Sequence, residues 1–85
     1  MIAWITKYAL TTGIIQHEGE ISPRFPNMFV VKGKDPLTMT QHFHGEGKEW
    51  HRTKQMAVLQ AEEMRLNKIR SLSRAIAKLE AKTFA

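Results

Sequence analysis

Residues Thr53–Lys82 read TKQMAVLQAEEMRLNKIRSLSRAIAKLEAK, and the fold of the chain depends on this stretch. It contains no Gly or Pro and consists mostly of good helix formers, so it predicts one continuous α-helix. At about 1.5 Å per residue, a helix of this length is on the order of 40 Å long. The residues before it can form only a small β-rich unit, roughly 20–25 Å across. We therefore expect one end of the helix to extend beyond the body that covers it.

The second half of the predicted helix has apolar residues at the 3-4-3 spacing of a coiled coil, with Ile at position a and Leu at position d. These four residues, called the apolar seam below, are Ile69, Leu72, Ile76 and Leu79. The pattern spans only two heptads, because Glu62 and Arg65 interrupt it upstream. It predicts a short helix–helix contact that makes a homodimer. The alternative is that the seam packs against the chain's own strands.

The net charge of +5 is concentrated on the same half of the helix. Residues 65–85 hold six Lys or Arg and a single acidic residue. Four of them follow one another at i, i+4 spacing, about 160° around the helix from the apolar seam. This basic row consists of Arg70, Arg74, Lys78 and Lys82. Charge alone leaves two interpretations open: a solvated face, or a binding surface for phosphate or for an acidic protein.

The first fifty residues alternate between strand-like segments and turn signals. Aromatic and β-branched composition with partial alternation predicts four strands. They are Ile2–Leu10, Gly13–Ile21, Met28–Lys32 and Leu37–His44. Turns are predicted at Thr11-Thr12-Gly13 and at Gly33-Lys34-Asp35-Pro36. Thr53 is a suitable N-cap for the helix that follows.

Together these elements predict an α+β fold in a single domain, residues 1–85. A small antiparallel meander of about four strands (1–50), with an SH3-like barrel as one form of it, precedes the long C-terminal helix (53–82). The core of so short a chain is too small to be very stable alone. A second copy is one way to supply the missing burial.

Three histidines are the weak candidates for a metal site. His42 and His44 share one face of a predicted strand, and His51 follows seven residues later. Three imidazoles can hold zinc with one position open. The spacing occurs in many ordinary strands and no strong fourth ligand is evident. We therefore interpret these residues as surface histidines and expect neither a metal nor another cofactor.

Trp50 lies shortly before the predicted helix. A tryptophan here is expected to wedge between helix and sheet. The alternative is that it contacts a partner, as aromatic residues often do in interfaces.

The sequence contains no nucleophile elbow, phosphate-cradling loop or paired-carboxylate site, so we expect no enzymatic activity. It has no cysteine, which fits a reducing cytosol. Its longest apolar runs are far shorter than the ~20 residues of a membrane span, and its N-terminus does not read as a signal peptide. We expect a cytoplasmic protein without membrane contact.

Three strings resemble a family of small, largely uncharacterised proteins encoded by tailed bacteriophages and prophages. They are TKYALTTGI (6–14), FHGEGKEWHRT (43–53) and AEEMR with IAKLEAKTF in the helix. The resemblance covers most of the chain except about residues 18–39. It implies an accessory protein in the cytoplasm of the bacterial host, and it brings no catalytic residues. Binding to a host or phage protein, such as a component of a defence system, is the function expected; nucleic-acid binding through the basic row is the alternative.

Overall fold

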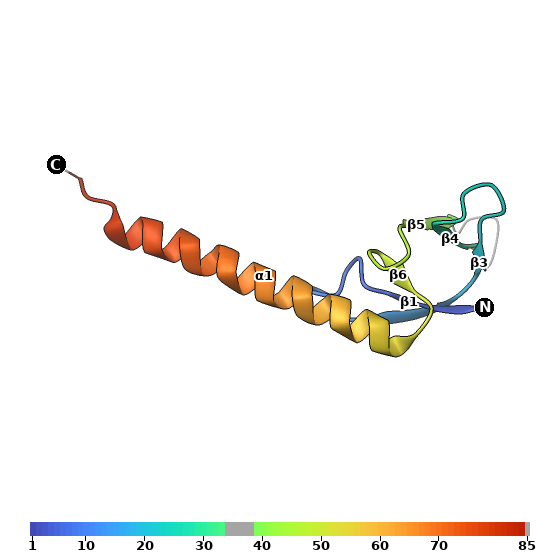
Figure 1. Cartoon of the computed structure of the whole chain (residues 1–85). Helices are drawn as coiled ribbons and strands as arrows, with labels where there is room; N and C mark the ends of the chain where they lie inside the picture. The colour runs from blue at the N-terminus through green and yellow to red at the C-terminus, as the bar shows by residue number, and fades with distance from the viewer. Residues whose placement is uncertain (34–38, 85) are drawn as a thin grey trace.

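A computed structural model describes residues 1–33 and 39–84 and contains six short strands followed by one long helix (Figure 1). The α+β class predicted from the sequence is confirmed. The elements are β1 (Ile2–Ile5), β2 (Ile15–Glu18), β3 (Glu20–Ile21), β4 (Met28–Val31), β5 (Gln41–His44), β6 (Trp50–His51) and α1 (Lys54–Ala81). The predicted turn at 33–36 and the start of the strand predicted at 37–44 fall largely outside the described residues.

The strands form two antiparallel three-stranded sheets, with orders β2-β1-β6 and β3-β4-β5. The segment predicted as one strand from Gly13 to Ile21 supplies β2 to the first sheet and β3 to the second. Gly19 separates the two, and a side chain there would overlap the carbonyl oxygen of Val30 and the Phe29 ring. The chain therefore changes sheets at the one residue small enough for this close approach. An SH3-like barrel stays a prediction.

The first strand is shorter than predicted, because β1 ends at Ile5 and a turn-rich connection follows. The amide of Thr12 donates to the carbonyl of Tyr8 (2.8 Å), and that of Ala9 donates to Thr6 (3.0 Å). These local bonds satisfy backbone groups that a continuing strand would have paired across the sheet. The predicted turn ends as expected at Gly13, whose φ of 92° favours glycine.

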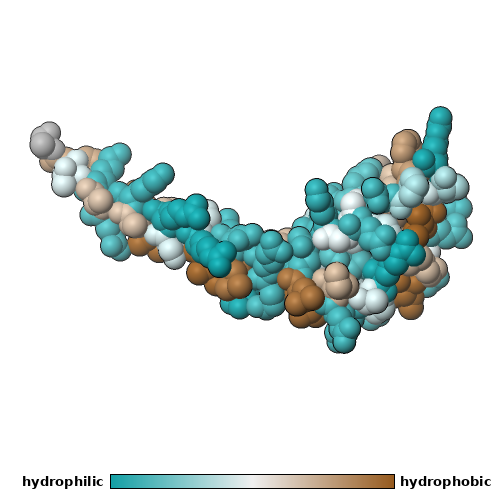
Figure 2. All heavy atoms as spheres, viewed as in Figure 1, coloured by the Kyte–Doolittle hydropathy of each residue, from teal (hydrophilic) through white to brown (hydrophobic). Residues whose placement is uncertain are grey.

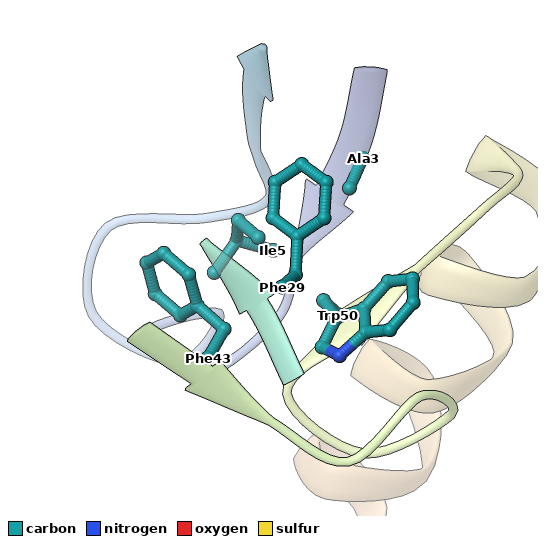
Figure 3. Packing of buried hydrophobic residues seen from close by; sticks show 5 residues of the cluster. All are labelled: Ala3, Ile5, Phe29, Phe43 and Trp50. Carbon is teal, nitrogen blue, oxygen red and sulfur yellow. The ribbon is translucent and has the colours of Figure 1, made fainter. Parts of the chain in front are cut away.

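The core lies between the two sheets and is dominated by aromatic side chains (Figure 3). Its buried cluster consists of Ala3, Ile5, Phe29, Phe43 and Trp50. The rings of Phe29 and Trp50 lie 5.4 Å apart. Ala57 is the buried residue of the described helix, so α1 adds little to this core. The core belongs almost entirely to the strands.

The helix begins and ends close to the predicted bounds. Thr53 is its N-cap, and the Thr53 hydroxyl accepts a hydrogen bond from the amide of Met56 (3.3 Å). The 28 residues correspond to a length of about 42 Å. The strands cover only its first turns, and the rest extends away from both sheets (Figure 1).

Candidate interaction surface on the C-terminal helix

The helix rests on the sheets through one short face near its start. Ala57 is buried, and Gln60, Ala61 and Met64 are half-buried. The small side chains of Ala57 and Ala61 allow the helix backbone to lie close to the strands beneath. From residue 65 to residue 81 every side chain is exposed. This free segment is about 25 Å long, so the predicted mismatch between helix and body is present.

The apolar seam lies on the free segment and has no cover from the chain itself. Its exposed fractions are 47%, 51%, 55% and 71% for Ile69, Leu72, Ile76 and Leu79. The alternative in which the seam packs on the chain's own strands is therefore wrong. Figure 2 shows apolar side chains along one side of the helix and hydrophilic ones along the other. A run of large apolar residues at helical spacing, open to water over several turns, is typical of a surface that another molecule covers.

The basic row is also exposed along its whole length. None of its four residues forms an ion pair with another described residue. Arg70 donates one hydrogen bond to the side-chain oxygen of Asn67 (3.3 Å). The basic row and the apolar seam thus lie on well-separated sides of the free segment, as the helical spacing predicts.

The interruption upstream of the seam is an ion pair within the helix. A nitrogen of the Arg65 guanidinium lies 2.8 Å from a carboxylate oxygen of Glu62. The hydrogen bond from Arg65, together with its charge, lowers the pKa of the Glu62 carboxyl. Both side chains are exposed, so this pair contributes little to the stability of the single chain.

Trp50 is fully buried, so the interpretation of this residue as a partner contact is wrong for this structure. Its indole nitrogen donates a hydrogen bond to the carbonyl oxygen of Asn27 (2.8 Å), and its ring packs on Phe29. β6 pairs with β1 and leads directly into the helix, which places the indole inside the core. Trp50 joins the two sheets beneath the start of α1.

His51 is buried, so its interpretation as a surface histidine is also wrong. The hydroxyl of Thr6 donates to the carbonyl of Lys48 (2.7 Å) and lies 2.9 Å from the His51 Nε2 atom. Since the hydroxyl proton is used, Nε2 carries the proton it donates to Thr6, and Nδ1 has no partner among the described residues. Burial lowers the pKa of His51, against a smaller opposing effect of Glu46.

His42 and His44 are exposed on β5, whereas His51 lies inside the other sheet. The structure does not bring the three candidate ligands together. Among residues 1–33 and 39–84, no group of three or more His, Asp or Glu side chains is placed to hold a metal ion. The backbone amide of His44 donates a hydrogen bond to the carboxylate of Glu49 (2.8 Å).

The apolar surface continues at the base of the helix, where the sequence also has apolar side chains around much of the helix. Met56, Val58 and Leu59 are all exposed, with Val58 at 41%. The signal that identifies Val58 is its position eleven residues before Ile69, where the heptad frame of the seam assigns a d residue. Val58 therefore extends the seam toward the sheets, beyond the ion pair.

Comparison of the chain with protein-family models, curated proteins and solved structures finds no match. Within the described residues, no helix is both long and apolar enough to span a membrane. The exposed helix with its two faces is the feature of the described chain that bears most on function.

Proposed function

We propose that this chain is a phage-encoded accessory protein that binds another macromolecule stoichiometrically and works as a homodimer. The binding target is a host or phage protein in the cytoplasm of the bacterial host, and the protein has no enzymatic activity. The observation that carries the proposal is the free segment, where four large apolar side chains are about half exposed or more. A second copy provides the cover that the chain's own strands do not.

The scale of the burial fits an association that depends on concentration. Full burial of a Leu or Ile side chain is worth about 1.5–3 kcal/mol, so covering a half-exposed one contributes about 1 kcal/mol. Eight such side chains in two copies contribute about 8 kcal/mol. Bringing two molecules together costs an amount of the same order, so only a small part of this burial appears as affinity. We therefore expect a weak dimer that forms at high micromolar and higher concentrations.

A second candidate function is nucleic-acid binding through the basic row. It is favoured by the exposure of the basic row, Arg70, Arg74, Lys78 and Lys82, on one side of the helix. Such binding would weaken steeply as salt rises, because each phosphate contact releases condensed counterions.

Capture from host lysate with the tagged protein, with and without nuclease, separates the two functions. We expect a protein to be captured in stoichiometric amounts and to survive nuclease treatment. The matched bait carries Leu72→Ala and Ile76→Ala, which remove part of the seam and leave the buried core unchanged. Capture that is lost to nuclease would favour the nucleic-acid function. Capture that is equally strong with the double variant would remove the dimer from the proposed function.

A further inference from the structure

The structure leaves the apolar seam open over more of the helix than the two heptads of its strongest repeat. In the same heptad frame, Val58 occupies d, Glu62 occupies a and Arg65 occupies d. All three are exposed. The sheets contact a neighbouring side of the helix, through Ala57 and its half-buried neighbours. One of these, Ala61, takes g in the same frame, so the sheets border this face at its base but leave Val58, Glu62 and Arg65 exposed to a partner helix.

We propose that the second copy lies parallel and in register along this face, forming a two-stranded coiled coil from Val58 to Leu79. The proposal rests on the homodimer of the proposed function and adds its orientation. The choice of side chains sets the number of strands, because among parallel coiled coils Ile at a with Leu at d favours two. Ile69 and Ile76 occupy a, and Leu72 and Leu79 occupy d.

The charges that flank the seam favour the parallel orientation. In a parallel pair, a g residue of one helix lies near the following e residue of the other. The three g-to-e neighbours between Val58 and Glu80 are Ala61 with Leu66, Lys68 with Ser73 and Ala75 with Glu80. None of these pairs brings like charges together, although the free segment is strongly basic.

An antiparallel arrangement centred on the seam has no such advantage. It sets Ile69 against Leu79 and Leu72 against Ile76 of the other copy. Lys68 then lies beside the partner copy's Lys82 at both ends of the contact. Like charges in such positions oppose association, and here the repulsion occurs twice.

An antiparallel arrangement centred on the ion pair fails for a different reason. It sets Glu62 against Arg65 of the other copy, which is favourable by charge. Ile76 and Leu79 then lie opposite residues 51 and 48 of the other copy, before its helix begins at Lys54. Half of the apolar seam would have no helix to pack against.

The ion pair acts differently in the parallel arrangement, where it fixes the register. In register, Glu62 faces Glu62 and Arg65 faces Arg65 of the other copy, so each of these two layers sets like charges together. The adjacent layer of opposite charge offsets this repulsion, and within one chain the Arg65 guanidinium lies 2.8 Å from the Glu62 carboxylate. A shift by one heptad would set one of these charges against Ile69 or Leu72. Polar residues at core positions specify register in this way, at some cost in stability.

A parallel dimer places both sheet bodies at the same end of the rod, on opposite sides of the helix pair. The two basic rows then lie on the outer surfaces, away from the interface. The protein presents two identical faces to its target, related by a two-fold axis along the rod.

Disulfide trapping tests the orientation directly, because the chain contains no cysteine of its own. In the parallel dimer, Leu79 of each copy faces Leu79 of the other, so Leu79→Cys should cross-link under mild oxidation. In the seam-centred antiparallel dimer the two positions are about 15 Å apart, too far for a disulfide, which needs Cα atoms roughly 4.4–6.8 Å apart. Leu79 is 71% exposed in the single chain, so the substitution does not disturb the fold.

Two matched samples complete the experiment. Ala77→Cys, on the outer side of the helix, measures cross-linking by random collision. An equimolar mixture of Ile69→Cys and Leu79→Cys reports the antiparallel pairing. We expect Leu79→Cys to cross-link at least tenfold faster than Ala77→Cys. Faster cross-linking of mixed than of like chains would overturn the parallel orientation and leave the homodimer in place. Rates equal to the Ala77→Cys control, with the mass of a single chain, would overturn both.

Discussion

Removing two side chains of the apolar seam separates the stability of the dimer from that of the fold. Leu72 and Ile76 are 51% and 55% exposed in the single chain. Changing both to Ala removes about 1 kcal/mol of burial per side chain, or about 4 kcal/mol over four side chains in the dimer. Since 1.4 kcal/mol corresponds to tenfold in affinity, the dissociation constant should rise by roughly a thousandfold. Alanine is the best helix former, so the helix of the single chain should not be weakened.

Analytical ultracentrifugation over a range of concentrations measures the dissociation constant, and circular dichroism at low concentration measures the fold of the single chain. The matched control is Met56→Ala, which removes a side chain of similar exposure (54%) off the seam and should leave the dissociation constant unchanged. Equal dissociation constants for the double variant and the wild type would show that the seam is not the dimer interface. So would a double variant that is unfolded at concentrations where the wild type is a folded monomer.

Three further predictions address the core, the buried histidine and the basic row. Trp50→Phe should lower the free energy of unfolding by about 2 kcal/mol, measured by urea denaturation, because the Asn27 carbonyl loses its indole donor. An unchanged free energy of unfolding would contradict the role of Trp50 in joining the two sheets. The pKa of His51 is lowered in the folded chain, so its contribution to stability is complete above the ordinary value near 6.5 and is lost as pH falls below it. Urea midpoints should therefore decrease from pH 7 to pH 5, and His51→Gln should reduce this decrease. The same pH dependence in the variant and the wild type would show that His51 does not cause it. A variant with Gln at all four positions of the basic row loses three like-charge pairs, which cost about 1 kcal/mol, but also loses the favourable interaction of Lys78 and Lys82 with the C-terminal end of the helix dipole, so its helix should gain less than about 1 kcal/mol in stability. The wild-type dimer should tighten with added salt, which screens the repulsion between its two basic helices. A dimer that weakens with salt would show that charge holds the interface together.

Local sequence signals predicted the helix well and the strands less well. The absence of Gly and Pro, together with Thr53 as N-cap, set bounds within one residue of those observed. The strands depend on pairing between distant segments, such as β1 with β6, which no local pattern specifies. That pairing is why Trp50 and His51 are buried, although a strand of two residues carries almost no sequence signal.

The sequence identified the residues of the candidate site but not which side of the helix the strands cover. The heptad spacing identified Ile69 and Ile76, and the i, i+4 spacing identified the basic row. The helix has apolar side chains on more than one side, so the pattern alone did not tell which side the strands cover. The structure assigns that role to Ala57 and its neighbours and leaves the seam open.

Sedimentation equilibrium of the wild-type protein, from low micromolar to several hundred micromolar, shows whether a second copy of this chain covers the apolar seam. We expect a mass that rises from one chain of 9.8 kDa toward twice that value. A mass that stays at 9.8 kDa over the whole range would contradict it.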